Sequence, residues 1–550
     1  MHRISTMRTR SPNSLIGWRI GVSSAVVSSA LALMLLGCGG SAPITSSTPD
    51  FSLSVSPSSV SADVGTATSP VTISVSSQNG FSDSVKVVLQ GLPQGVTASP
   101  SSSFSLAAGT NQSLTFSVAD SADVGPSSIT VVATAGTHTH SAQFTLTAKA
   151  LVRTYQSGSV LYLESATATD TSRVGLDTNW GGSIVEVSVN GTNFVNADDT
   201  GREVQPSFYD GNAHYDGCAG CSGNWGWNPV LAGDGYDHGT PIITQLLSPQ
   251  SMYIKAQPLQ WIPDGKGGGP DQPVLSDVMV EQTVTALPNY AHTFQVHCKV
   301  THLGSDQHAD AGQEFPAVYV NAQYNRFVYY SGTNPWTNGA VSFAQFQHLG
   351  DPGFLLYVPE RWGAHVNEQN EGLAVFVPSQ YPYVSGFDSP ESNTNYFLPF
   401  SMLTFAPNVT FEGNFYIIAG DYGAARQVIY DLHKQLGDPA NIFAPIGATD
   451  VPASGDTVSG VVTVAGWAFG NVSVSKIEVL VDGKVDGAAS YGSSRPDVPE
   501  VYPHAPANSG FSYSLDTTRY ANGSHILNVR VTDTSGNIGI FSNVAVVISN

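Results

Sequence analysis

The sequence predicts an all-β protein made of several sandwich units. Short runs of alternating apolar and polar residues recur along the chain, separated by clusters of Gly, Asn, Pro and Ser. The 550 residues include 55 Gly and 33 Pro but only 11% charged residues, and long amphipathic helical patterns are nearly absent. A chain of this length is too long for one domain, so three or four folded units are expected.

Residues 1–37 are predicted to be an export signal. Several arginines precede an apolar run from Ile20 to Leu36, which is short for a stable membrane span and ends in small residues. The tetrapeptide Leu-Leu-Gly-Cys, ending at Cys38, resembles the lipobox of bacterial lipoproteins. This resemblance implies lipidation of Cys38, and Gly39 in place of aspartate implies anchoring to the outer membrane or cell surface. The alternative is a plain secretory signal with an incidental cysteine.

A flexible tether, residues 38–50, is predicted to lead into a first small sandwich, residues 51–150. About seven short strands in about 100 residues are typical of an immunoglobulin-like fold. The segment F-S-L-S-V-S-P-S-S-V resembles cysteine-free Ig-like modules of exported bacterial proteins, which implies a spacer. Residues 441–550, with V-S-G-V-V-T-V-A-G-W-A-F and I-E-V-L-V-D-G-K-V, resemble the bacterial Ig-like domains appended to secreted carbohydrate-active proteins.

The largest predicted unit covers residues 151–440 and is mostly alternating β pattern. It contains a hairpin in which residues 184–189 are followed by Asn190-Gly191, a pair that favours a type I′ turn. Near its end, Asp421 and Gly437 are predicted to cap an amphipathic helix. A long antiparallel unit with one packed helix indicates a large two-sheet sandwich.

This central unit resembles the galactose-mutarotase-like sandwiches found in polysaccharide lyases, glycosidase domains and sugar epimerases. The resemblance rests on W-G-G-S-I-V-E-V, D-D-T-G-R-E-V-Q, N-W-G-W-N-P-V and Q-E-F-P-A-V-Y-V, and on the terminal helix. It covers about half of the chain and implies a two-sheet super-sandwich that acts on sugars. It indicates no particular enzyme family, so the chemistry must be argued from the candidate site.

The densest group of polar side chains follows the hairpin, between Asp198 and Asp210. Unpaired buried charge is costly, so this segment is expected to form the floor of a polar cleft. The candidate catalytic residues are Glu314, Glu203, Asp199 and Glu281. The candidate substrate-binding residues are Arg202, Gln205, Tyr209, His214, Trp225, Trp227, Asn228 and His238. A structural ion pair is the alternative for Arg202–Glu203.

Three functions remain open at this point. A glycoside hydrolase needs two carboxyl groups about 5–5.5 Å apart for retention, or about 6.5–9.5 Å apart for inversion. A polysaccharide lyase needs a Tyr or His base and a group that offsets the substrate carboxylate, for which Tyr209, His214, His238, Arg202 and Gln205 would serve. The third function is glycan binding or adhesion without catalysis, with aromatic rings facing the sugar. Hydrolysis is favoured because the unit is acidic.

The charge balance limits the partners of the protein. The whole chain has a formal net charge of −21, and residues 151–440 contain 10 Lys and Arg against 28 Asp and Glu. Such a field disfavours nucleic acid and anionic lipid. A polysaccharide or oligosaccharide substrate is therefore expected to be neutral rather than polyanionic.

The cysteines suit an exported protein. Cys218 and Cys221 form a CxxC, which in an oxidising compartment favours a short disulfide that pins the aromatic loop. A zinc site with His214 and His238 is the alternative. Cys298 lies in an apolar run and is expected to be buried and free. No cofactor is predicted, although this composition is compatible with a structural Ca²⁺ or Zn²⁺.

Overall fold

The computed structural model describes residues 48–167, 169–210, 227–346, 355–437, 442–540 and 544–550. These residues are mostly strands, arranged in six sheets, with few and mostly short helices. The predicted all-β fold class is therefore confirmed. None of the helices in these ranges is long and apolar enough to cross a bilayer.

Residues 50–149 form two sheets with a common core. The first sheet has the order β1 (Asp50–Ser56), β3 (Val71–Gln78), β7 (Asn111–Val118), β5 (Val96–Ser99). The second has the order β2 (Ser59–Asp63), β9 (His138–Lys149), β8 (Gly125–Ala135), β4 (Ser84–Gln90), β6 (Ser103–Ala107). Alternate residues such as Val71, Ile73 and Val75 are buried between the sheets, as a two-residue side-chain period requires.

The central unit contains a 13-stranded sheet. Its main path is β10 (Leu151–Ser157), β11 (Val160–Ala166), β12 (Thr171–Asp177), β13 (Ser183–Val189), β15 (Val204–Ser207), β22 (His308–Asn321), β29 (Thr394–Pro399), β28 (Tyr383–Ser389), β25 (Leu356–Tyr357). Shorter strands pair beside this path: β14 (Thr192–Asn193), β16 (Pro229–Val230), β19 (Leu259–Gln260), β30 (Ser401–Phe405).

A nine-stranded sheet faces it. The order is β17 (Ile242–Ser248), β18 (Ser251–Ala256), β20 (Val278–Ala286), β21 (Thr293–His302), β31 (Thr410–Asp421), β27 (Glu371–Phe376), β26 (Trp362–Val366), β23 (Arg326–Tyr329), β24 (Ser342–Ala344). Leu163 and Val318 of the first sheet share one buried cluster with Ile254 and Phe415 of the second. The two sheets therefore pack face to face, and the opposite phase of their strands points away from this shared core.

The predicted hairpin is present, with a bulge that its alternation did not predict. Asn190 and Gly191 have φ values of 51° and 81°, as a type I′ turn requires, and β14 pairs back onto β13. The register shifts because Gly175 faces Glu186 whereas Leu176 faces Ile184. This bulge allows both Ile184 and Val187 into the core while Glu186 points outward.

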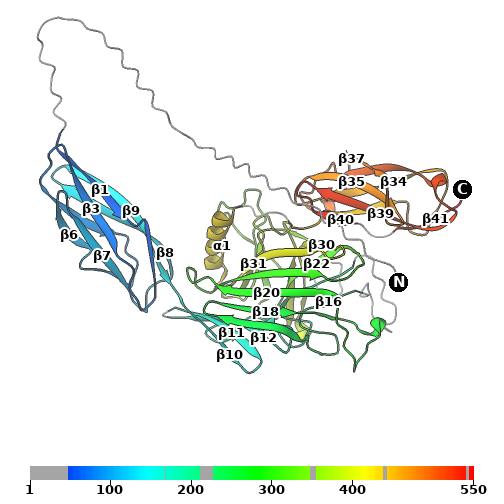
Figure 1. Cartoon of the computed structure of the whole chain (residues 1–550), viewed down its shortest axis with the longest axis horizontal. Helices are drawn as coiled ribbons and strands as arrows, with labels where there is room; N and C mark the ends of the chain where they lie inside the picture. Colours follow the sequence, from blue (N-terminus) through cyan, green and yellow to red (C-terminus); the bar gives the residue numbers. More distant parts are fainter. Residues whose placement is uncertain (1–47, 168, 211–226, 347–354, 438–441, 541–543) are drawn as a thin grey trace, which may run out of the picture. The chain divides into compact units, whose positions relative to one another are not determined.

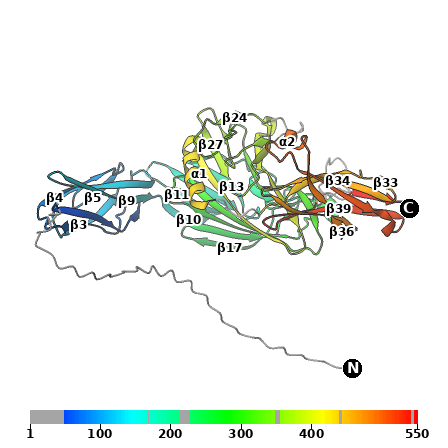
Figure 2. The same ribbon diagram turned by 90° about the horizontal axis from the view of Figure 1, so that it is seen from above.

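The predicted helix is α1 (Tyr422–Leu436), with Asp421 and Gly437 as its caps. Asp421 Oδ1 accepts a hydrogen bond from the Ala424 amide at 2.9 Å, and the Gly437 amide donates to His433 O. The helix buries its apolar stripe in a cluster with β26, β27 and β31. Figure 1 shows α1 to the left of β31, and Figure 2 shows it beside β27 from another side.

The C-terminal residues form two further sheets. One has the order β32 (Ile446–Val451), β34 (Val461–Phe469), β38 (Gly510–Asp516), β37 (Ser490–Ser493). The other has the order β33 (Thr457–Val458), β41 (Val544–Ile548), β39 (Gly523–Asp533), β35 (Val474–Val481), β36 (Lys484–Ala488), with β40 (Ile538–Ile540) on β39. The short helices of the described chain are η1 (Asp264–Lys266), η2 (Pro390–Ser392), α2 (Val498–Val501) and η3 (Thr517–Arg519).

Candidate functional site

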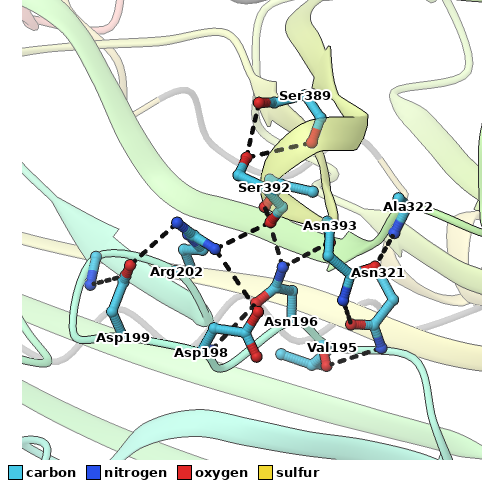
Figure 3. Close-up of polar contacts among 12 residues, drawn as sticks. Val195, Asn196, Asp198, Asp199, Arg202, Asn321, Ala322, Ser389, Ser392 and Asn393 are labelled. Atoms are coloured by element: carbon cyan, nitrogen blue, oxygen red, sulfur yellow. Dashed lines mark hydrogen bonds and ion pairs between the residues drawn. The ribbon is translucent and has the colours of Figure 1, made fainter.

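Arg202 lies between two carboxylates and a turn from another part of the chain. Its Nη2 is 3.2 Å from Asp199 Oδ2 and its Nη1 is 3.7 Å from Asp198 Oδ2. Nη1 also donates to Ser392 O at 3.0 Å, and the Asn196 side chain donates to the carbonyl of the next residue at 2.7 Å (Figure 3). The ion pairs of Arg202 are therefore with the two aspartates, whereas its effect on Glu203 is only a longer-range charge interaction.

Glu203 is fully buried beside this network. It adopts φ = 123°, a conformation that costs a non-glycine residue free energy and that is common at functional sites. Gln205 Nε2 donates to Glu203 Oε2 at 2.8 Å, whereas Oε1 has no hydrogen-bond partner in the described structure. Burial raises the pKa of Glu203 well above its ordinary value, the charge of Asp199 raises it further, and Arg202 opposes the shift.

Glu314 lies on the neighbouring strand β22, opposite Ser207 of β15. Tyr396 Oη donates a hydrogen bond to Glu314 Oε1 at 2.6 Å. Burial raises the pKa of Glu314, while hydrogen bonds from Tyr396, Tyr209 and Ser207 partly offset the increase. A carboxyl group that keeps its proton to a higher pH than usual is suited to act as a general acid.

Tyr319 is the common neighbour of these groups. Its ring centroid is 4.5 Å from that of Tyr396 on the adjacent strand. Burial raises the pKa of Tyr319 well above its ordinary value, and the nearby Glu314, Tyr209, Glu203 and Asp199 raise it further. The Tyr319 amide donates a hydrogen bond to Glu203 O at 3.2 Å, and the neighbouring Tyr396 binds Glu314, so Glu203 and Glu314 both lie near Tyr319. The fold thus brings together three of the four predicted catalytic carboxyl groups, and we call them, with the three tyrosines, the Tyr319 cluster.

The outer face of the same sheet continues the polar surface across β10 to β13. Arg173 Nη2 is 2.7 Å from Glu186 Oε1, and the Arg173 guanidinium lies 4.7 Å above the Tyr162 ring. Tyr155 and Tyr162 stack with centroids 5.2 Å apart. This group of half-buried aromatic and charged side chains, the Tyr155–Tyr162 ladder, offers both ring faces and hydrogen-bonding groups.

Glu281, the fourth catalytic candidate, is not brought together with the others. It lies on β20 of the nine-stranded sheet, on the phase opposite to the buried Val280 and Gln282. Its Oε1 is 3.7 Å from Lys299 Nζ and 3.9 Å from Lys255 Nζ. A hydrogen bond from Tyr253 at 2.7 Å, together with the two lysines, lowers the pKa of Glu281. Its contacts are those of a paired surface carboxylate.

Several predicted binding residues make structural contacts. Asn228 Nδ2 donates to Phe208 O at 2.9 Å, and His238 Nδ1 lies 2.9 Å from the buried Asp234 Oδ2. The Trp227 ring stacks on His308 with centroids 3.8 Å apart and is only 4% exposed. Two other binding candidates, His214 and Trp225, lie outside the described residues, as do the lipidation site Cys38 and the CxxC of Cys218 and Cys221. Cys298 is buried and free, as expected, and burial raises the pKa of its thiol to about 12.

Sequence reasoning missed Tyr319 and Tyr396. Both carried a usable signal, because each stands in a strand beside apolar residues of the opposite phase. Val318 and Val320 flank Tyr319 and point into the core, and Phe397 does so next to Tyr396. A tyrosine on the outward phase of an otherwise apolar strand therefore marks the face that carries polar chemistry.

Comparison with known proteins gives a family only for the C-terminal part of the chain. No curated protein matches. Among solved structures, an alpha-galactosidase from Lactobacillus brevis is 11% identical over 52% of this chain and 42% of its own, with a TM-score of 0.28. A polysaccharide lyase is 8% identical over 72% and 48%, with a TM-score of 0.27. An endo-beta-1,4-mannanase from Thermotoga petrophila is 17% identical over 23% and 24%, with a TM-score of 0.15.

The chain thus spans less than half the length of each of these structures, and similarity at this level carries no argument about activity. Function must instead be argued from the chemistry of the site. The match to a family is more specific: residues 446–529 match the bacterial Ig domain.

Proposed function

We propose that the protein is a glycoside hydrolase whose active site is the Tyr319 cluster, on the outer face of a galactose-mutarotase-like sandwich. The observation that carries the proposal is the grouping of Glu314 with Glu203 and Asp199 near Tyr319, although Glu314 comes from a distant part of the chain. Glycoside hydrolysis requires one carboxyl group that donates a proton and a second that acts as base or nucleophile. The cluster supplies carboxyl groups in different environments.

In this proposal Glu314 is the general acid, because burial raises its pKa and thereby favours the protonated form. Asp199, paired with Arg202, is the second carboxylate. Glu203 is a positioning residue that holds Gln205 through a 2.8 Å hydrogen bond. Tyr155 and Tyr162 provide ring faces for the apolar side of sugars, and Arg173 and Glu186 provide hydrogen bonds to hydroxyl groups.

Glycan binding without catalysis is the second candidate, and the Tyr155–Tyr162 ladder favours it. Stacked rings beside a charged pair would bind sugars whether or not the Tyr319 cluster performs chemistry. A lyase is less well supported. Burial raises the pKa of Tyr209 and Tyr396 well above 10, so neither phenol readily gives the phenolate that a base requires.

The test is a panel of polysaccharides treated with the full-length protein. We expect new reducing ends without the ultraviolet absorbance of an unsaturated lyase product. Glu314→Gln keeps the shape of the side chain but removes its acidity, so kcat/KM should fall about 10²- to 10⁴-fold. Glu412→Gln, an exposed glutamate of the other sheet, is the matched control and should retain activity. Glycan binding with no release of reducing ends would support the second candidate, and retained activity in Glu314→Gln would refute the assignment of the acid.

We also propose that the protein is exported and anchored through lipidated Cys38, with residues 51–150 as a spacer between the anchor and the sandwich. The apolar run that stops at Leu-Leu-Gly-Cys supports this proposal. Cys38→Ser should move the chain from the membrane fraction to the soluble fraction of a bacterial host and abolish labelling with a radioactive fatty acid. An unchanged distribution would contradict it.

A further inference from the structure

Four side chains with metal-binding atoms meet where the chain passes from β21 to β22. Asp277 directly precedes β20, His302 ends β21, and Asp306 and His308 follow in the connection and at the start of β22. One ligand atom from each residue lies within 4.8 Å of the others. Both imidazoles are buried, whereas Asp306 is exposed, so the group is embedded on one side and open on the other.

The spacing of these atoms matches the coordination shell of a small ion. Asp277 Oδ2 is 3.2 Å from His302 Nε2 and 3.9 Å from His308 Nε2. Asp306 Oδ1 is 3.7 Å from His302 Nε2, and its Oδ2 is 3.8 Å from His308 Nε2. Ligand atoms about 2.0–2.1 Å from a tetrahedral Zn²⁺ are roughly 3.4 Å apart. One observed distance is slightly shorter than this value and three are somewhat longer, so the ligand atoms would have to move only slightly closer together to hold the ion.

The histidine contacts leave both Nε2 atoms directed at carboxylates. His302 Nδ1 lies 2.9 Å from Ala406 O, which can only accept, so Nδ1 carries a proton. His308 Nδ1 lies 2.9 Å from Asp210 Oδ2, and its buried Nε2 has no hydrogen-bond partner. Each Nε2 lies within 4 Å of oxygens of both Asp277 and Asp306, so a cation between these atoms would have nitrogen and oxygen ligands.

Gly304 leaves room for such a cation. A Cβ placed on Gly304 would lie 2.5 Å from Asp277 Oδ2, from Asp306 Oδ1 and from His302 Nε2. One point close to Gly304 is thus nearly equidistant from three of the four donor atoms. Any side chain at position 304 would occupy this point.

We propose that Asp277, His302, Asp306 and His308 bind one Zn²⁺ ion that fastens the β21–β22 connection between the two sheets of the sandwich. Two imidazoles favour zinc over Ca²⁺, which prefers an all-oxygen shell. Groups behind the ligands hold them in place, because Asp210 and Ala406 O orient the two rings and Trp227 Nε1 donates to Asp277 Oδ1 at 2.7 Å. The site is independent of the proposed hydrolase chemistry.

The test measures metal content and affinity in the full-length protein. Protein purified without chelator should contain one zinc per chain by mass spectrometry, and chelator-treated protein should take up one Zn²⁺ in calorimetry. Added Co²⁺ should give the intense visible absorption of a tetrahedral site. Gly304→Ala keeps all four ligands but places a methyl group among them, so it should abolish binding. Asp306→Asn changes an exposed side chain and should weaken binding without unfolding the protein.

Two further variants change a residue that orients a ligand and a histidine far from the site in sequence. Asp210→Asn should lower the Zn²⁺ affinity about 10- to 100-fold, as expected for loss of a carboxylate that orients a ligating histidine. His525→Gln removes a histidine that pairs with Asp482 at 2.7 Å in the C-terminal unit, and it should leave metal content unchanged. The proposal is overturned if the wild-type protein binds neither Zn²⁺ nor Co²⁺, if it binds only Ca²⁺, or if Gly304→Ala binds Zn²⁺ as tightly as the wild type. In the first case the four residues form ion pairs only.

Discussion

Glu203 shows how a single residue can carry both strain and a displaced pKa. Its backbone has φ = 123°, its side chain is fully buried, and only one of its two carboxyl oxygens has a hydrogen-bond partner. An ionised carboxylate in this place would be desolvated beside Asp199, so the neutral form is favoured. Stability should therefore depend on pH through this residue.

The direction of this pH dependence follows from the difference between the Glu203 pKa in the folded protein and in the unfolded chain. The folded protein keeps the proton on Glu203 to a higher pH than the unfolded chain, in which a glutamate has a pKa of about 4.3. This contribution is fully present below about pH 4.3 and is lost as the pH rises toward the folded-state pKa, by up to about 1.4 kcal/mol per pH unit. Glu203→Gln should remove this part of the pH dependence and give a shallower decline of the free energy of unfolding.

Urea unfolding followed by tryptophan fluorescence would measure this, since six of the eight tryptophans lie within residues 151–440. Glu412→Gln, at an exposed position, should keep the wild-type slope. Equal slopes for wild type and Glu203→Gln between about pH 5 and 8 would refute the inferred shift of the Glu203 pKa.

At the scale of single elements, the sequence best predicted the turns and helix caps, whose conformation depends on residues nearby in the chain. The turn at Asn190-Gly191 and both caps of α1 are where the sequence placed them, because positive φ and capping hydrogen bonds depend on near neighbours. The bulge in β13 was not predictable, because it depends on how β12 and β13 pair. Pairing also decides that Glu314 and Glu203 lie on one sheet and Glu281 on the other.

The cap of α1 provides a test at this scale. Asp421→Ala removes the hydrogen bond to the Ala424 amide, and loss of such a cap costs about 1 kcal/mol. Amide hydrogens of α1 should then exchange about five-fold faster, while those of β20 and β21 should be unchanged. Asp431→Ala, an exposed substitution within the same helix, is the control. An exchange rate in Asp421→Ala equal to that of the control would show that the cap contributes little.

For the whole molecule, the sandwich architecture and its acidic charge follow from composition and pattern, whereas the site does not. Residue 314 is distant in sequence from residues 199 and 203, and the pairing of β15 with β22 brings it close to them. The zinc ligands meet for a similar reason, since β20 and β21 pair with Val278 opposite His302. Antiparallel register, which a single sequence specifies weakly over long separations, therefore creates both sites.

The net charge of the whole molecule predicts how salt affects the binding of neutral and anionic glycans. With a net charge of −21, and 28 acidic against 10 basic residues in positions 151–440, the field around the sandwich repels anions over about one Debye length. A neutral glycan should bind with an affinity that NaCl hardly changes. A carboxylated or sulfated polymer with the same backbone should bind more weakly at low salt, and added NaCl should narrow the difference because it screens the repulsion. Affinity measurements on matched neutral and anionic polymers at low and high NaCl would decide this. Tighter binding of the anionic polymer that weakens with salt would mean that Arg173 and Arg202 dominate the local field and that the substrate is a polyanion.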